Sequence, residues 1–199
     1  MRKALSTILA GGAAAALTVG MATPATAGPA YAWGGPGEKT ITAIAAGNDN
    51  FSYLVAALQA TGLDAVLDRS DVTVTVFAPT NAAFEKAADE LAAAGVGDGT
   101  VPTLLGFLIA NDLADDVLLY HVTGDRRFSN SVVPKKGTKP VSTLLAGSSI
   151  GVTSAGQVVD AAGATSNAGI VAANIKASNG VIHVIDNVLV PLPIAAAAS

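Results

Sequence analysis

Hydrophobic residues in the first half of the chain recur every three to four positions, which is the spacing of one face of a helix. The clearest case is residues 51–58, where Phe, Leu, Val and Leu fall at positions i, i+3, i+4 and i+7. Asp49 precedes this stretch as an expected cap, and Gly62 follows it. Residues 63–67 predict a second, shorter helical turn.

A different pattern begins at Thr73. Residues 73–78 alternate threonine with valine or alanine, apart from Phe77, which predicts a strand with one buried face and one half-polar face. Pro79-Thr80-Asn81 ends the strand and caps a helix over about 82–94. Three spaced glycines between 95 and 99 then indicate a loop.

Two more helices are expected before residue 124. Pro102 fits the first turn of a helix over 103–110. Asp112 is a plausible cap for the next, which leads into Leu118-Leu119-Tyr120-His121-Val122.

Beyond Gly124 the pattern changes to short apolar runs separated by turn residues. Helices early in the chain and strands late in it indicate an α+β domain. The strand candidates are 132–133, 141–145, 150–153, 157–160, 170–177 and 181–190. The last run opens with Asn179-Gly180, a dipeptide that favours a tight turn at positive φ, and stops before Pro191, which lacks an N–H for sheet pairing.

The N-terminus reads as a targeting segment. Residues 1–27 combine a basic start, an apolar stretch and an Ala25-Thr26-Ala27 cleavage pattern, which together predict a secretory signal peptide. Residues 28–37 hold too much glycine and proline for a helix or strand and predict a flexible leader. A domain over 38–193 and a tail over 194–199 follow, and no transmembrane anchor is expected after signal cleavage.

Net charge and cysteine content exclude several classes of function. Without residues 1–27 the chain has 9 Lys+Arg against 15 Asp+Glu, a net charge of −6, which argues against nucleic acid as a partner. The chain has no cysteine, so thiol catalysis and Cys-rich zinc sites are excluded.

The two histidines, His121 and His183, are the only candidate imidazole ligands. Meeting in space with a carboxylate, they could bind zinc or iron. Each has apolar neighbours, however, where a histidine is usually a hydrogen-bonded core residue. The structural interpretation is favoured, and no metal or other cofactor is predicted.

Two further motifs are better explained as local structure. Residues 147–151 match the Gly-x-Ser-x-Gly nucleophile elbow around Ser149, but that motif requires a helix after the serine, and the sequence there predicts a strand. The acids Asp112, Asp115 and Asp116 lack the alternation of a calcium loop. We expect a hairpin turn and a solvated helix face.

Three segments in order resemble the signature of fasciclin-type (FAS1) domains. They are 75–84, Tyr120-His121 and 179–191. The chain is similar to a bacterial, secreted, single-domain member of this family over about 39–193. The resemblance implies a β-wedge, or sandwich of short strands, with helices packed against it. It also implies mainly structural roles for the motif residues Thr75, Phe77, Pro79, Asn81, Asn179, Gly180, His183 and Asp186.

The resemblance also implies candidates for adhesion. Animal members bind integrins through an Asp-Ile pair just before the second motif, and this chain has Asn174-Ile175 there. Because the carboxylate is missing, integrin binding is not favoured. Tyr120 and His121 match the family's other proposed adhesion element, and we expect contacts near them and the loop 123–130.

The leading hypothesis is a secreted, non-catalytic protein acting in cell adhesion or extracellular matrix interaction. Its expected partner is a cell-surface, matrix or polysaccharide ligand, and the oligomeric state is left open. The alternative is a small-ligand or metal carrier with a pocket between helices and sheet. A hydrolase using Ser149 is the third possibility.

Overall fold

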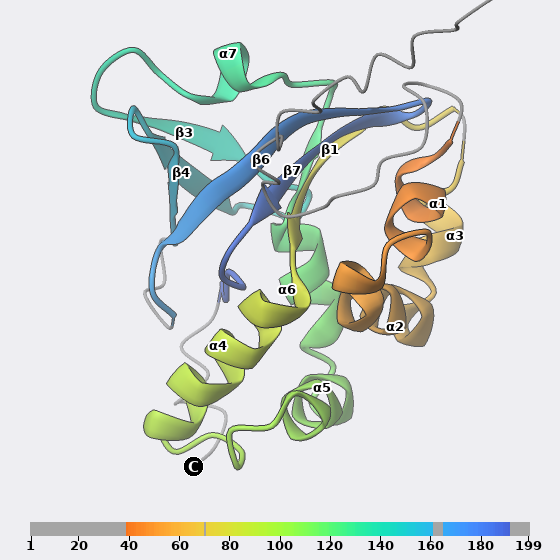
Figure 1. The fold of residues 1–199 in the computed structure, drawn as a ribbon, viewed down its shortest axis with the longest axis vertical. Coiled ribbons are helices and arrows are strands. Elements are labelled where there is room, and N and C mark those ends of the chain that lie inside the picture. The colour runs from red at the N-terminus through yellow and green to blue at the C-terminus, as the bar shows by residue number, and fades with distance from the viewer. Residues whose placement is uncertain (1–38, 70, 161–164, 192–199) are drawn as a thin grey trace, which may run out of the picture. The chain divides into compact units, whose positions relative to one another are not determined.

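A computed structural model describes residues 39–69, 71–160 and 165–191 of the chain (Figure 1). The predicted signal peptide, leader and tail lie outside these residues. In the described part, no helix is both long and apolar enough to span a bilayer.

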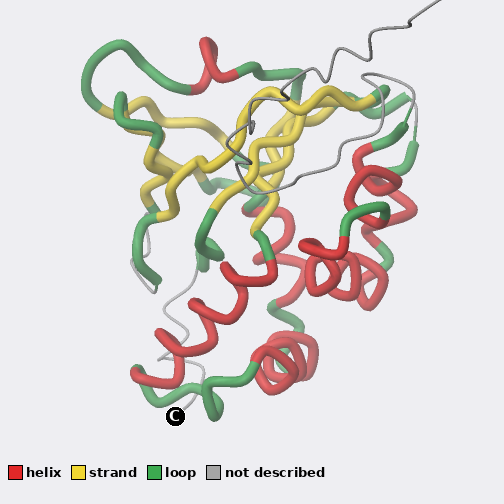
Figure 2. The backbone as a smooth tube through the Cα atoms, in the orientation of Figure 1, coloured by secondary structure: helices red, strands yellow, loops and turns green. Residues whose placement is uncertain are grey.

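The described domain combines helices with one mixed sheet, which confirms the α+β class (Figure 2). Six α-helices and a short 3-10 helix, η1, precede or interrupt the first strands. They are α1 (Ile41–Ala46), η1 (Asp49–Phe51), α2 (Ser52–Thr61), α3 (Leu63–Leu67), α4 (Asn81–Ala93), α5 (Val101–Ala110) and α6 (Ala114–Tyr120). Helix α7 (Ser129–Val132) lies apart from these, on the other side of the strands (Figure 1).

The sheet has seven strands in the order β2-β1-β7-β6-β5-β4-β3. Only β1 and β7 are parallel to each other, and the remaining neighbours are antiparallel. The strands are β1 (Val74–Pro79), β2 (Val122–Gly124), β3 (Thr138–Ser142), β4 (Ser149–Thr153), β5 (Gln157–Val159), β6 (Ala168–Ala177) and β7 (Gly180–Ile185). Strand β6 pairs with β5 at Ala168 and Gly169 and with β7 from Ile170 to Ala177, with register shifts against β7 between Ile170 and Ile175.

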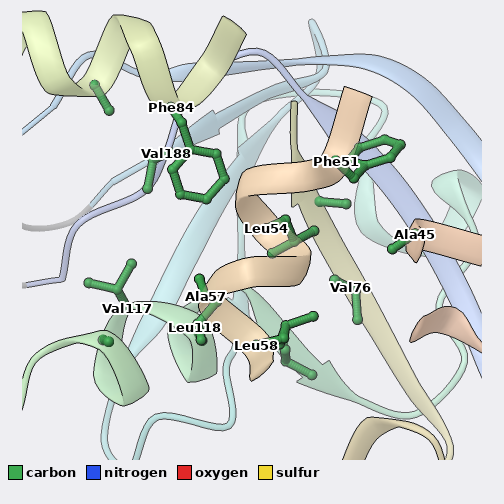
Figure 3. Packing of buried hydrophobic residues seen from close by; sticks show 14 of the residues in the cluster. Ala45, Phe51, Leu54, Ala57, Leu58, Val76, Phe84, Val117, Leu118 and Val188 are labelled. Atoms are coloured by element: carbon green, nitrogen blue, oxygen red, sulfur yellow. The ribbon is translucent and has the colours of Figure 1, made fainter. Parts of the chain in front are cut away.

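Two hydrophobic clusters cover the two faces of the central strands. The larger one packs the helices against Val76 of β1 and Ile182 of β7, and Figure 3 shows Leu54 and Leu58 of α2 pointing toward Val76 and Leu118. The smaller one surrounds Phe77 on the opposite face and gathers side chains from β3, β4 and β5. Every residue of β1 is therefore buried, and the expectation of a half-polar face is wrong because this strand is covered on both sides.

The predicted helix-end signals at Thr80 and Gly62 are confirmed. Thr80 caps α4 by accepting the N–H of Ala83 at 3.2 Å, and Gly62 ends α2 with a left-handed φ of 72°. Asp49 does not cap α2, because it opens the 3-10 helix η1, and Phe51 occupies the N-cap position of α2 without a side-chain bond. Asp112 does not cap α6 either. It has a positive φ of 55°, and Leu113 occupies the N-cap position without a side-chain bond.

Other corrections concern the strands. Residues 132–133 are not a strand, because Val132 ends the short helix α7. The third strand covers Thr138–Ser142 and not 141–145. The run 181–190 is a strand only as far as Ile185, where Asp186 and Asn187 turn the chain, so Pro191 does not end the pairing.

Gly180 is required by close packing and not by its turn. Neither Asn179 nor Gly180 has a positive φ, so the expected left-handed turn is absent. A Cβ on Gly180 would lie 2.0 Å from the carbonyl oxygen of Val74, in the parallel partner strand. Only glycine lets β1 and β7 approach this closely.

Candidate functional site

The residues of the first motif hold neighbouring segments to β1. Thr75 Oγ1 donates to the carbonyl of Asp125 and accepts the N–H of Arg127, both at 2.8 Å. Phe77 is fully buried, with its ring 5.5 Å from that of His183. Pro79, also buried, is the last residue of the strand.

Asn81 links the start of α4 to the helix before it. Its amide nitrogen donates to the Asp49 carbonyl and the Ser52 hydroxyl, at 2.8 and 2.9 Å, and its oxygen accepts the N–H of Tyr53 at 3.2 Å. In the described part of the chain, the side chain of Asn81 therefore bonds to η1 and α2 and serves to hold them to α4.

His183 connects β7 to the segment that crosses the outer face of the sheet. Its side chain is fully buried, and Nε2 donates to the Arg127 carbonyl at 2.9 Å. Nδ1 faces the N–H of Asn174 at a longer 3.4 Å. Burial lowers the pKa of His183, although the bond to the Arg127 carbonyl acts in the opposite direction. The ring is thus a neutral link between segments.

His121 also links two segments of the chain, on the helix side of the sheet. Nδ1 donates to the Val117 carbonyl at 2.7 Å, and Nε2 accepts the N–H of Leu189 at 3.0 Å. Because a carbonyl only accepts and an N–H only donates, these partners select the neutral tautomer with the proton on Nδ1. Burial lowers the pKa of His121 to about 4.

The two histidines do not form a metal site together. His121 lines a small cavity on the helix side of the sheet together with Val76 and Ile182. The ring of His183 packs against that of Phe77 on the opposite face. Among the described residues, no group of three or more His, Asp or Glu side chains is placed to hold a metal ion.

Tyr120 points inward as well. Its hydroxyl donates to Asp160 Oδ1 at 3.1 Å and lies 3.3 Å from the Ser149 carbonyl. Asp160 Oδ2 accepts the N–H of Val190 at 3.1 Å, so this pair joins α6 to the end of the chain. Tyr120 is 1% exposed and His121 2%, which corrects their assignment as direct contact residues, because neither is accessible to a partner in this conformation.

Asn174 and Ile175 lie in the irregular part of β6 and differ in exposure. Asn174 is exposed, with a positive φ of 64°. Its Oδ1 accepts the N–H of Ser129, and its Nδ2 donates to the Ser129 hydroxyl, both at 2.7 Å. Ile175 is half-buried against the helix-side core. Asn174 therefore anchors α7, and of the two only Asn174 is an exposed residue.

Asn179 joins the β6–β7 hairpin to the first helices. Its Oδ1 accepts the N–H of Ile41 at 3.0 Å. Its Nδ2 donates to the carbonyls of Leu67 and Arg69, at the end of α3. At the other end of β7, the exposed Asp186 accepts the N–H of Gly169.

One polar cluster was not singled out from the sequence. Asn187, fully buried, donates to the Ser166 carbonyl at 2.8 Å and to Glu90 Oε2 at 3.2 Å. Burial alone would raise the pKa of Glu90, but bonds from Ser166 and Asn187 outweigh it and leave this pKa below its usual value. The available signal was the polar pair Asp186-Asn187 interrupting an apolar run.

Ser149 is not in a nucleophile elbow. It begins β4, directly after the turn from β3, and a strand follows it instead of a helix. Of the acids 112, 115 and 116, the first two line a surface hollow of about 190 Å³. No carboxylate cluster there meets the requirement for a metal site in the described residues.

The cavities between helices and sheet are small. Two apolar cavities border His121, each about 20 Å³ in volume. Larger hollows of about 290 and 360 Å³ lie open on the surface of α1 and α2 and share Ala46, Val55 and Gln59. The interior thus has room for about one water molecule per cavity.

Comparison with known proteins places this structure in a family. The Fasciclin domain model matches residues 49–191, and the chain belongs to this family of α+β FAS1 domains. Among solved structures, it is similar to a FAS1 domain pair from the insect cell adhesion molecule Fasciclin I. The TM-score is 0.58 at 15% identity, covering 76% of this chain and 51% of that chain, which supports the fold.

Two sequence relatives extend the comparison. Protein sll1483 of Synechocystis sp. is 39% identical over 76% of this chain and 73% of its own length. The transforming growth factor-beta-induced protein ig-h3 of Sus scrofa is 35% identical over 78% of this chain and 20% of its own length. The chain therefore spans only about a fifth of that larger relative.

Proposed function

We propose that this chain is a secreted, non-catalytic FAS1 module that binds a cell-surface, matrix or polysaccharide component. The observation that carries the proposal is the family match over 49–191, together with structural similarity to a domain pair from a cell adhesion molecule. The N-terminal signal pattern supports export of the protein.

The side chains of the motifs support a binding role without catalysis. Thr75, Asn81, Asn179 and both histidines hydrogen-bond to neighbouring segments, as a rigid scaffold requires. Binding then belongs to exposed loops carried by this scaffold. The segment 125–131 meets this description of an exposed binding loop. Its residues Asp125, Arg126 and Asn130 are exposed. Its backbone is held in place by hydrogen bonds to Thr75 and His183.

The carrier alternative is less well supported. Pockets for small molecules typically measure ~300–1,000 Å³, whereas the two cavities between helices and sheet are about 20 Å³ each. A ligand there would have to displace core side chains such as Leu54 and Leu118, which line both of them.

The proposal is tested by export and retention together. The protein is expressed in a secreting bacterial host, and the mass of the extracellular product is measured; cleavage after Ala27 leaves a chain that begins at Gly28. The labelled product is then incubated with whole cells, isolated envelopes and extracellular polymer, with a heat-unfolded sample as the control. We expect retention of the folded protein only. A protein that stays inside the cell, or that none of the three materials retains, overturns the proposal.

A further inference from the structure

The charges of this chain are separated between its two halves. Residues 39–125 carry twelve acidic and three basic residues, whereas residues 126–185 carry six basic residues and one acidic residue, Asp160. Asp160 is buried beside Tyr120. Although the whole chain has a negative net charge, all charged residues of 126–185 other than the buried Asp160 are positive.

The fold brings these basic residues to the side of the sheet that faces away from helices α1–α6. Lys176 pairs with Val181 across the β6–β7 ladder. Directly paired residues share a face of a sheet, and Val181 lies on the face of His183 and not of Ile182. The backbone of Arg127 crosses that same face, bound to Thr75 and His183.

Short contacts connect two of the remaining basic residues to neighbouring segments. Arg126 Nη2 donates to the Ser178 carbonyl at 2.8 Å, in the β6–β7 turn. Lys139 Nζ donates to the carbonyl of Ser131, in α7, at 2.6 Å. Lys135 and Lys136 are exposed in the loop between α7 and β3. We define this basic face by Arg126, Arg127, Lys135, Lys136, Lys139 and Lys176.

Most of these charges have no carboxylate partner. Arg126 and Lys139 bond to backbone carbonyls, which are neutral, and in the described chain only Arg127 of the six forms an ion pair, at 3.5 Å with the exposed Asp125. On the helical half, by contrast, Arg69 pairs with Asp71 and Lys86 with Glu90. Uncompensated cations on one face create a positive potential that attracts anions.

From this geometry we infer that the basic face binds an acidic polysaccharide, one whose carboxylate or sulfate groups repeat along the chain. The inference rests on the proposed function and names the chemistry of its partner. Four of the six cations are lysines, which act as point charges toward spaced anionic groups. A nucleic acid fits less well, because single-stranded binding uses exposed aromatic rings for stacking, and in residues 126–160 and 165–185 the only such ring, that of Phe128, is half-buried.

The test compares two variants with the same net charge. The first, Lys135→Gln/Lys136→Gln, removes two charges from the basic face. The matched control, Lys86→Glu, reverses one charge on α4 and so changes the net charge by the same two units. Binding of the full chain and both variants is measured on immobilised polygalacturonate, dextran sulfate and neutral dextran at several salt concentrations. Melting temperatures establish that all three proteins are folded.

We expect the unsubstituted chain to bind at least one of the two anionic polymers and not dextran, with affinity that falls as salt rises. The first variant should lose about tenfold or more in affinity, and the control less than about threefold, because screened interactions act locally. Equal losses in both variants overturn the inference, as does equal binding to dextran.

Two other outcomes assign the face to a different partner and overturn the inference. One is tighter binding to duplex DNA than to either anionic polymer at the same salt concentration. The other is salt-sensitive self-association by light scattering that the first variant abolishes, which would make the face an interface between copies.

The two proposals fail separately. Retention on cells or extracellular polymer without any binding to the anionic polymers overturns the inference about the basic face and leaves the proposed function standing. Binding to an anionic polymer without retention on any biological material overturns the proposed function and leaves the inference about the basic face standing.

Discussion

Thr75 and Thr123 face each other across β1 and β2, yet their hydroxyl groups have different surroundings. Thr75 Oγ1 makes two hydrogen bonds to the segment that follows β2. Thr123 Oγ1 is equally buried but has no hydrogen-bond partner in the described part of the chain. A buried hydroxyl without a partner costs free energy, whereas a bonded one stabilises the fold.

We therefore predict opposite effects of the same substitution at these two positions. Thr123→Val removes an unpaired hydroxyl and should raise the free energy of unfolding by roughly 1 kcal/mol. Thr75→Val leaves two backbone groups unpaired and should lower it by about 1–3 kcal/mol. Urea unfolding measures both, and a loss of stability in Thr123→Val would show that its hydroxyl has a partner.

At the scale of elements, the segment between β2 and β3 is held mainly by side chains and not by sheet pairing. Asn174 of β6 binds the first residue of α7 through both its oxygen and its nitrogen. Its positive φ of 64° is tolerated by asparagine better than by most residues. The irregular part of β6 thus positions α7 and the neighbouring basic residues.

Asn174→Ala should detach α7 without unfolding the domain. It removes both bonds to Ser129 and places alanine at a positive φ, so we expect the free energy of unfolding to fall by about 1–2 kcal/mol. Amide hydrogen exchange should accelerate at residues 129–133 and stay slow in β1.

Asn174→Asp is the control for this prediction. It retains an acceptor for the Ser129 N–H and should leave exchange in α7 close to that of the unsubstituted chain. Unchanged exchange in Asn174→Ala would show that other contacts hold α7.

At the scale of the whole molecule, the two histidines join segments on opposite faces of the sheet, and both are neutral. Their pKa values are lowered by burial, that of His121 to about 4. In the unfolded chain the histidine pKa is near 6.5, so just below that pH the unfolded chain binds protons that the folded chain does not bind. Stability from these residues is therefore present above pH 6.5 and is lost as the pH falls below it, for His121 over the range down to about pH 4.

The resulting prediction concerns the pH dependence of unfolding. Between pH 6.5 and 5, before most carboxylates titrate, His121 should contribute a loss of roughly 2 kcal/mol in the free energy of unfolding. His183 acts in the same direction.

His121→Gln should be less stable at neutral pH, because the Val117 and Leu189 partners are disturbed. Its free energy of unfolding should vary less with pH over this range. Urea unfolding at several pH values tests this prediction, and equal slopes in both proteins would contradict it.

Much of the local structure could be predicted from sequence, because its causes are local. The spacing of apolar residues identifies α2, and Thr80 and Gly62 mark the start of α4 and the end of α2 through bonds and backbone angles within a few residues. The α+β class followed from the order of these patterns. An error arose where a distant contact decides, in the short helix α7, whose anchor, Asn174, is far along the chain.

The Asn179–Pro191 run shows the same division. Its β-branched residues predict a buried strand, but the end of that strand at Ile185 is decided by the contacts of Asp186 and Asn187 with Gly169, Ser166 and Glu90. The need for Gly180 likewise comes from its contact with Val74 in the parallel strand.

By itself, the sequence determined the types of most helices and strands, the family resemblance and the overall acidic charge, since each depends on residue identity and short-range spacing. Only the tertiary structure decided the tautomers of His121 and His183, the burial of Tyr120 and the contacts of Arg126, Lys139 and Lys176 with neighbouring segments. These properties depend on which segments meet in space, because hydrogen-bond partners, desolvation and electrostatic potential are set by distance and not by position along the chain.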